Sequence, residues 1–143
     1  MDGYRKNSHA VFDIKQHVIW GTKCRYKVLH GPIAIRIREL IRQGCEVRGI
    51  TILLGNVGKD HIHLLLCYPP SLAPSKIMQH LRDRSSRLLQ DQFPDLKKKY
   101  WGQHLWARGY FCATVGTVNE DTIRTYIANQ FNEEKNDIFR IDD

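Results

Sequence analysis

Two apolar segments joined by a short glycine-rich connection place the strongest constraint on how this chain can fold. Residues 46–54 (EVRGITILL) and 61–67 (HIHLLLC) are rich in residues that favour strands, and GNVGKD lies between them. Two glycines, an asparagine and an aspartate predict a turn in this connection. The two segments are therefore expected to pair as an antiparallel hairpin, around which the rest of the chain must be built.

A strand and a helix are predicted before this hairpin. Residues 11–20 (VFDIKQHVIW) alternate between apolar and polar side chains, which is typical of a half-buried strand. Its apolar face carries Phe12, Ile14, Val18 and Trp20, and its polar face carries Asp13, Lys15 and His17. Gly31-Pro32 then opens a helix whose apolar residues follow helical spacing, and Gly44 is predicted to stop it.

The pattern after the hairpin predicts a second helix, a further strand and a last helix. These elements are a helix over roughly 75–92 that Pro94 ends, a basic and aromatic loop over 94–109, a strand over about 110–115 and a last helix over roughly 118–135. Thr117 and Glu120 have the spacing of a capping box at the start of the last helix.

The predicted order of elements is βαββαβ with an added C-terminal helix. This order is typical of the α+β class, with a ferredoxin-like (RRM-like) antiparallel sheet whose helices pack on one face. The sequence shows no internal repeat or Gly/Ser linker, so residues 1–143 are expected to form a single domain. The opposite face of the sheet, or the terminal helix, is then left for function. The fold alone does not decide the function, because it hosts many.

The charge of the chain points to a polyanionic partner. Twenty-two Lys and Arg against 15 Asp and Glu give a net charge of +7. The helix over 75–92 carries basic side chains at steps of three and four residues, namely Lys76, His80, Arg84 and Arg87. Lys97, Lys98 and Lys99 stand beside Tyr100 and Trp101, two aromatic residues on which bases can stack. A nucleic acid is the predicted partner, and a merely solvated basic face is the alternative.

Cysteine usage and hydropathy indicate a reducing compartment. None of the four cysteines belongs to a C-x-x-C pair, so a zinc ribbon is not expected. Residues 1–8 are polar, and no apolar stretch approaches the ~18 residues that a membrane span needs. We therefore expect a cytoplasmic protein with free thiols and no membrane association.

The tripeptide His61-Ile62-His63 is the sharpest chemical feature. Residues i and i+2 of a strand point to the same face, so both imidazoles project together while Ile62 faces the core. Two neutral imidazoles can grip a divalent metal ion. The alternative is a pair of histidines on a solvated sheet face. Asp60 and the turn before the pair, and the apolar run after it, place the histidines at the start of a well-anchored strand.

Tyr126 and Gln130 offer a second set of functional groups in the last helix. They are four residues apart and share one helical face, and Ile123 and Ile127 lie close enough to pack that face against the body. The side-chain oxygen of Gln130 is a hard donor suited to Mg²⁺ or Mn²⁺, and Tyr126 is a candidate nucleophile. A surface pair is the alternative, and only the conjunction with the two histidines favours a shared site.

These residues closely resemble the single-tyrosine HUH transposases, called TnpA, of small insertion sequences that move as single-stranded DNA. The resemblance runs from about residue 9 to 131. It rests on HVIWGTKCRYKVL, KDHIHLLLCYPP, APSKIMQHLRDRSSRLLQDQFPDLKKKYWGQHLWARGYFCATVG and YIANQ. Asn56-Val57-Gly58-Lys59 departs from the Met-Pro associated with that turn in the family, although it contains no ligand position.

The resemblance implies a DNA transposase that cuts and rejoins single strands at hairpin-bearing element ends. By that resemblance His61 and His63 are the HUH histidines, Gln130 is the third ligand of a Mg²⁺ or Mn²⁺ ion, and Tyr126 forms a 5′-phosphotyrosine. Family members are homodimers whose tyrosine helix can act across the dimer. The basic residues of the second helix match the family only in general character.

Two other functions remain open at this point. One is a non-catalytic DNA- or RNA-binding module on a ferredoxin-like sheet, which would carry aromatic residues where HIHLLLCY offers histidines. The other is a metal-dependent hydrolase or oxygenase that uses His61 and His63. A facial-triad oxygenase needs a carboxylate as third ligand, and a hydrolase leaves no tyrosine adduct.

Overall fold

The computed structural model describes the backbone of residues 5–6, 11–12, 14–116, 119–134 and 137–139. Side chains are described for residues 14–116 and 119–129. The predicted capping residue Thr117 therefore lies outside the described residues, and so does the side chain of Gln130.

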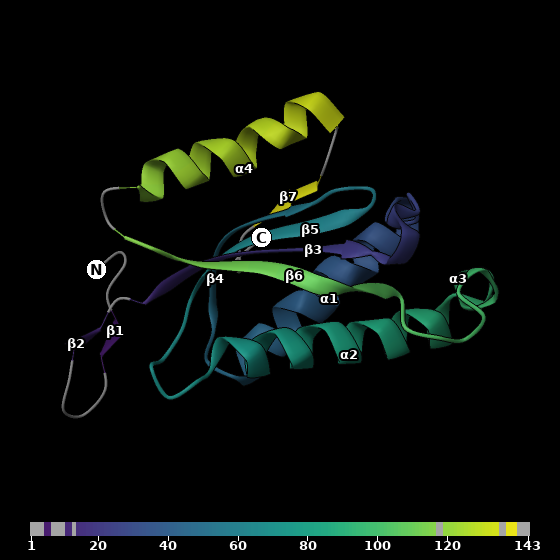
Figure 1. The fold of residues 1–143 in the computed structure, drawn as a ribbon, viewed down its shortest axis with the longest axis horizontal. Helices are drawn as coiled ribbons and strands as arrows, with labels where there is room; N and C mark the ends of the chain where they lie inside the picture. The colour runs from purple at the N-terminus through teal and green to yellow at the C-terminus, as the bar shows by residue number, and fades with distance from the viewer. Residues whose placement is uncertain (1–4, 7–10, 13, 117–118, 135–136, 140–143) are drawn as a thin grey trace.

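An antiparallel sheet forms the centre of the protein (Figure 1). Within the described residues its strands are ordered β6-β3-β5-β4-β7, and all neighbouring strands are antiparallel. Their bounds are β3 (Lys15–Thr22), β4 (Thr51–Val57), β5 (His61–Cys67), β6 (Trp106–Val115) and β7 (Asp137–Phe139). The order β6-β3-β5-β4 is that of a ferredoxin-like sheet, so the predicted fold class is confirmed. Two short strands, β1 (Arg5–Lys6) and β2 (Val11–Phe12), pair separately.

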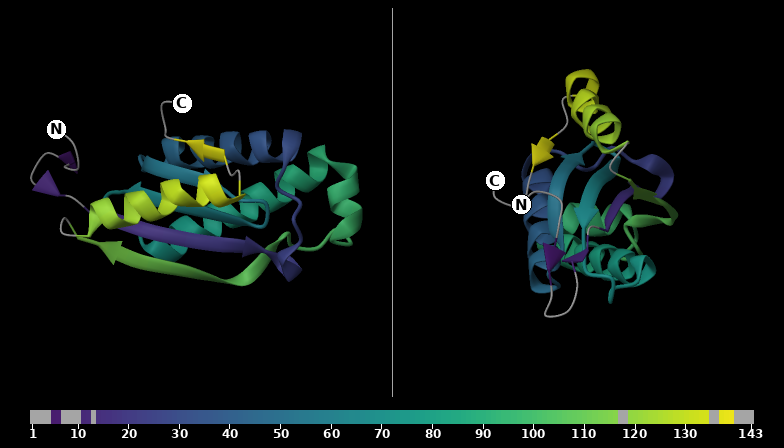
Figure 2. Two further views of the ribbon diagram at one scale, coloured as in Figure 1. Left: turned by 90° about the horizontal axis from the view of Figure 1, so that it is seen from above. Right: turned by 90° about the vertical axis from the view of Figure 1, so that its left-hand side faces the viewer.

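Helices cover both faces of this sheet (Figures 1 and 2). Helices α1 (Gly31–Val47) and α2 (Pro74–Gln92) lie against one face, and α4 (Glu120–Glu134) lies across the other. The short helices η1 (Lys23–Arg25) and α3 (Pro94–Lys99) connect larger elements. The added C-terminal helix is thus confirmed, and it forms a third layer over the sheet.

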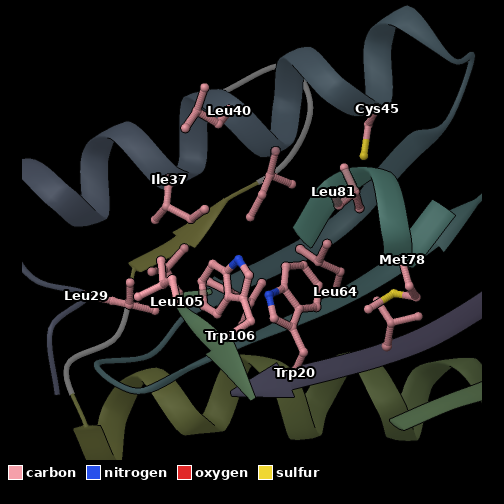
Figure 3. Close-up of a cluster of buried hydrophobic side chains, with 14 of the residues drawn as sticks. Trp20, Leu29, Ile37, Leu40, Cys45, Leu64, Met78, Leu81, Leu105 and Trp106 are labelled. Carbon is pink, nitrogen blue, oxygen red and sulfur yellow. The ribbon is translucent and has the colours of Figure 1, made fainter. Parts of the chain in front are cut away.

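The main core lies between the sheet and the pair α1 and α2 (Figure 3). Trp20 of β3 and Leu64 of β5 point into it, where they meet Ile37 of α1 and Met78 of α2. Because successive side chains of a strand alternate, the neighbours of these residues on β3 and β5 must face α4. A smaller apolar cluster lies under α4 and consists of Leu54, Leu65, Val115 and Ile127, with Leu53 and Ile123 against it.

Burial under α4 corrects the prediction that the strand before the first helix is half-buried. Lys15 and His17, the expected solvent face of that strand, are both buried. The strand is also shifted, because β3 extends from Lys15 to Thr22 rather than over 11–20.

Gly44 does not stop the first helix, which continues to Val47. A Cβ at Gly44 would lie 3.0 Å from Cδ2 of Leu81, so the glycine permits close packing of α1 on α2. The helix ends where Gly49 adopts a φ of +69°.

The remaining boundaries differ for local reasons. Residues 46–47 belong to α1, and β4 runs through Gly55, Asn56 and Val57, which were predicted as part of the turn. Pro94 ends α2 but also opens α3, since a proline is tolerated in a first helical turn. Strand β6 begins at Trp106, inside the predicted loop. Strand β5 and helix α2 agree with the prediction within one residue.

Candidate active site

His61 and His63 occupy the face of β5 that α4 covers. Ile62 between them is buried on the opposite face, within the main core. The register pairs His63 with Ile19 of β3 on one side and with Asn56 of β4 on the other. Both imidazoles therefore project from the middle of the sheet on one side, as the tripeptide predicts, and His63 is fully buried there.

Tyr126 reaches the same place from α4. Buried Ile127 and half-buried Ile123 pack the helix on the sheet, and Tyr126 remains 51% exposed. The phenol ring meets the ring of His63 edge to face, with the two centroids 5.2 Å apart. The structure thus brings Tyr126 to the histidines of its own chain.

His17 is a third imidazole at this place, and the sequence did not single it out as functional. Its ring stacks on that of His63 with centroids 4.2 Å apart, and their Nε2 atoms contact each other. The ring of Tyr126 lies 6.5 Å away, centroid to centroid. Burial lowers the pKa of His17 below the usual value for histidine. His17 therefore lies in a neutral, packed position under both His63 and Tyr126.

Asp60 orients His61. The Nδ1 atom of His61 lies 2.9 Å from Oδ1 of Asp60, and Arg25 contacts the same carboxylate at 3.2 Å. Burial alone would raise the pKa of Asp60, but the hydrogen bonds from His61 and Arg25 hold it below its usual value. An ionised Asp60 favours the proton on Nδ1 of His61, which is the arrangement that presents Nε2 to a metal ion.

A hollow on the surface lies beside these groups and contains both His61 and Tyr126. Its lining residues come from β3, η1, β5, β6 and α4, and they are Ile19, Trp20, Gly21, Arg25, His61, Ala107, Gly109 and Tyr126. A phosphodiester placed in this hollow would meet a phenol, an imidazole and the guanidinium of Arg25. The arrangement suits phosphoryl transfer to a tyrosine.

The part of the sequence that forms this site matches known proteins. Residues 10–130 match the family described as Transposase IS200 like. The transposase of insertion sequence IS200 from Salmonella typhimurium is 36% identical over 128 residues, which span 90% of this chain and 84% of that protein. The chain belongs to the IS200-like transposase family. It is also similar to the ISDra2 transposase TnpA of Deinococcus radiodurans, which is 32% identical over 91% of this chain and 93% of that protein.

Solved structures agree with the fold of this IS200-like transposase. A crystal structure of a transposase from Deinococcus radiodurans superposes with a TM-score of 0.73 and 31% identity, over 88% of this chain and 97% of that one. A REP-associated tyrosine transposase bound to a REP hairpin superposes with a TM-score of 0.58 and 13% identity, over 89% and 68% of the two chains. The second likeness shows the fold alone.

Helix α2 of this IS200-like transposase, which carries the predicted basic residues, lies on the sheet face opposite α4 (Figure 1). A shallow hollow there is lined by Arg48, Lys76, Gln79, His80, Asp83, Arg84 and Arg87. The structure therefore brings the four predicted basic residues of this helix together. Arg84 is partly engaged, since its guanidinium donates to the carbonyl of Leu40 at 3.3 Å. Burial and the charges of Arg48 and Arg84 lower the pKa of His80. These basic residues of α2 and Tyr126 of α4 belong to helices on opposite faces of the sheet.

The two aromatic residues after the three lysines differ in their exposure to solvent. Tyr100 is buried, and its hydroxyl lies 3.4 Å from the carbonyl of Lys23, whereas Trp101 is 88% exposed. Burial raises the pKa of Tyr100 to about 12. Of these two predicted stacking residues, only Trp101 presents its ring to solvent.

Gln130 lies in α4, one turn beyond Tyr126, and its side chain is outside those that the structure describes. Among the described residues, no three His, Cys, Asp or Glu side chains form a group that could hold a metal ion. None of the helices in the described part is long and apolar enough to cross a membrane.

Proposed function

We propose that this IS200-like transposase cleaves and rejoins single-stranded DNA at hairpin-bearing ends through a 5′-phosphotyrosine on Tyr126. The observation that carries the proposal is the contact between His63 and Tyr126, beside a surface hollow that contains His61 and Tyr126. A rigid helix holds the phenol at this hollow, and a nucleophile must be held close to in-line attack.

The reaction is a transesterification. The Oη atom of Tyr126 forms a bond to phosphorus, and the bond from phosphorus to the 3′ oxygen of the preceding nucleotide breaks. The phenol loses its proton, and the leaving 3′ oxygen gains one. The phosphotyrosine conserves the energy of the broken bond, so a later attack by a 3′-OH reverses the step without ATP. Arg25, beside the hollow, supplies a positive charge for the non-bridging oxygens.

A divalent metal ion is proposed to bind at this place. His61 and His63 would hold it, with Gln130 as the third ligand, and the amide oxygen of Gln130 is a donor that suits Mn²⁺ or Mg²⁺. Three neutral ligands leave the ion its full charge, and a bound ion would polarise the scissile phosphate. The contact of Asp60 with Nδ1 of His61 supports this assignment, since ligating histidines commonly donate their second N–H to a carboxylate.

DNA binding is assigned to the basic face of α2, defined by Lys76, His80, Arg84 and Arg87. These residues line one hollow on a protein with a net charge of +7. That face and the candidate active site lie on opposite sides of the sheet. In this proposal the folded hairpin binds at α2, and the single-stranded DNA next to it passes around the edge of the sheet to Tyr126. The solved REP-associated tyrosine transposase, of like fold, is bound to a hairpin.

The protein is further expected to act as a homodimer, with a tyrosine helix that can also serve the partner subunit. Strand β6 is an edge of the sheet within the described residues, and it exposes Tyr110 and Phe111. An unpaired edge strand that carries exposed aromatic rings favours association. A sedimentation mass of a monomer at micromolar concentration, together with intact cleavage, would contradict the dimer.

The experiment that tests the function uses end-labelled single-stranded DNA with a hairpin, incubated with the protein and Mg²⁺. We expect a covalent protein–DNA adduct on a denaturing gel, and tighter binding of hairpin-bearing single strands than of plain duplex. A non-catalytic binding module would retard the DNA without forming an adduct. A metal-dependent hydrolase would cut the DNA and leave no adduct.

A further inference from the structure

Asn56 places a polar amide at the centre of the contact between β4 and the tyrosine helix α4. Its side chain is fully buried, and the register sets it directly opposite His63 of β5. The Nδ2 atom donates a hydrogen bond to the backbone carbonyl of Ile127, with 2.9 Å between donor and acceptor. Ile127 immediately follows Tyr126, so this bond joins the strand beside one proposed metal ligand to the residue after the proposed nucleophile.

Apart from His63, the sheet residues described around this contact are apolar. Leu54, Leu65 and Val115 of the sheet pack against Ile127. Among the described residues the Oδ1 atom of Asn56 has no hydrogen-bond partner. A buried amide that is only half satisfied costs free energy, and an apolar side chain with the same branching, such as leucine, would avoid that cost. The amide therefore contributes little net stability to the contact. What it contributes is a directed bond to one carbonyl of the helix.

Direction is what the apolar part of this contact lacks. Apolar contact is non-directional, so a few aliphatic side chains penalise a small shift of the helix along its axis, or a small rotation about it, less than a directed bond does. Either motion carries Tyr126 away from His63. A single donor aimed at one carbonyl penalises both motions. A second polar contact lies at the start of the helix, where Nζ of Lys15 is 2.5 Å from Oε1 of Glu120. The two contacts together fix the position of α4 along its axis and its rotation.

We propose that Asn56 is a positioning residue that sets the register of α4 on the sheet and thereby holds Tyr126 against His63. Its effect on cleavage rests on the proposed function, whereas its effect on the docking of α4 does not. Asn56 touches neither the reacting phosphate nor the phenol, and it acts through the backbone of Ile127. The bond must also break before α4 can leave its own sheet for that of a partner subunit.

Asn56→Leu tests this role, because it keeps the branching of the side chain at Cγ and removes the donor. Asn56→Val serves the same purpose should the leucine variant fold poorly. The matched control is Leu54→Val, which lies two residues earlier on the same face of β4 and loosens the same helix without touching the hydrogen bond. The measurements are single-turnover cleavage of saturating hairpin DNA, DNA affinity, melting temperature, and hydrogen exchange of the α4 amides.

For the Asn56 variants we expect full final cleavage but a rate constant lower by about 100-fold, as misplacement by an ångström can cause. DNA affinity should stay within about twofold, and α4 amides should exchange faster than in the wild type. Leu54→Val should lower the melting temperature and leave the rate constant within about twofold.

A folded Asn56 variant that cleaves at the wild-type rate would overturn the proposal. A lower final extent of cleavage with an unchanged rate constant would also overturn it, and so would an equal loss of rate constant in Leu54→Val. Either result shows a purely structural role. If the wild type forms no adduct at all, the proposed function fails. Hydrogen exchange then still decides about Asn56, since unchanged protection of α4 in the variants contradicts the register role and faster exchange supports it.

Discussion

The ring of His63, from the central strand β5, and the ring of Tyr126, from the last helix, meet edge to face at a centroid distance of 5.2 Å. The contact joins two parts of the sequence that were far apart: the tripeptide predicted to bind a metal ion and the helix that carries the candidate nucleophile. It depends on α4 covering the sheet face opposite α1 and α2, so that strand side chains pointing away from the main core meet the tyrosine helix.

Removal of either imidazole of β5 tests the proposed metal site. We expect His61→Ala and His63→Ala each to lower the cleavage rate and Mn²⁺ affinity by more than about 100-fold, since each ring alone is a poor chelate. DNA affinity should be unchanged, because the basic face of α2 lies on the other side of the sheet. Titration with Mn²⁺ by electron paramagnetic resonance and a gel-shift assay measure the two affinities. His30→Ala, at an exposed position before α1, is the matched control.

His17 should support His63 without binding the substrate. We expect His17→Ala to lower the cleavage rate by about tenfold to 100-fold, the range usual for residues that orient a metal ligand. The substitution leaves a gap under both His63 and Tyr126, whose rings pack on His17. DNA affinity measured in parallel should not change, and a variant that cleaves as fast as the wild type would show that His17 only fills space.

The central part of the fold could be predicted because its signals are local. HIHLLLC is a continuous apolar run bounded by a turn, and it forms β5 with the predicted bounds. The proline at 74 and the apolar spacing after it define α2 to within a residue. These signals suffice for the order of elements, and the order in turn restricts the sheet to a ferredoxin-like arrangement.

The errors arise where a residue serves a distant neighbour. Gly44 looks like a helix stop but makes room for Leu81 of α2. Asn56 lies between two glycines, which is typical of a turn, yet it pairs with His63 inside a strand. His17 alternates with core residues, a pattern that predicts exposure to solvent, because the sequence alone does not show that α4 covers this face. The exposed Trp101 and buried Tyr100 are likewise separated only by tertiary packing.

The basic face of α2 should produce a measurable salt dependence. We expect Lys76→Gln and Arg87→Gln, both exposed, each to weaken binding of hairpin-bearing single-stranded DNA and to reduce the salt slope of log Kobs by about 0.9, the value for one phosphate of a duplex stem. Lys27→Gln removes an equally exposed charge elsewhere and is the matched control. Unchanged slopes in the α2 variants would place the DNA on another surface.

The contact of Glu120 with Lys15 and Arg124 should make stability depend on pH. Burial alone would raise the pKa of Glu120, but its hydrogen bonds to Lys15 and Arg124 hold the pKa below the ordinary value of 4.5. Because the folded pKa is depressed, the stabilisation is fully present above pH 4.5 and is lost as the pH falls through the folded pKa. Glu120→Gln should therefore reduce the free energy of unfolding by about 1–3 kcal/mol at pH 7, and the difference should shrink in acid. Denaturant unfolding of both proteins across this range checks the expectation, which an equal difference at every pH would contradict.

Identification of the residue that carries the DNA tests the central claim most directly. The wild-type protein is incubated with hairpin-bearing single-stranded DNA and Mg²⁺, digested, and analysed by mass spectrometry. Tyr126→Phe and the exposed control Tyr26→Phe are treated alike. We predict a nucleotide on the peptide that contains Tyr126 in the wild type and in Tyr26→Phe, and neither cleavage nor adduct in Tyr126→Phe, although that variant still folds and binds DNA. An adduct on any other tyrosine, or undiminished cleavage by Tyr126→Phe, would contradict the account.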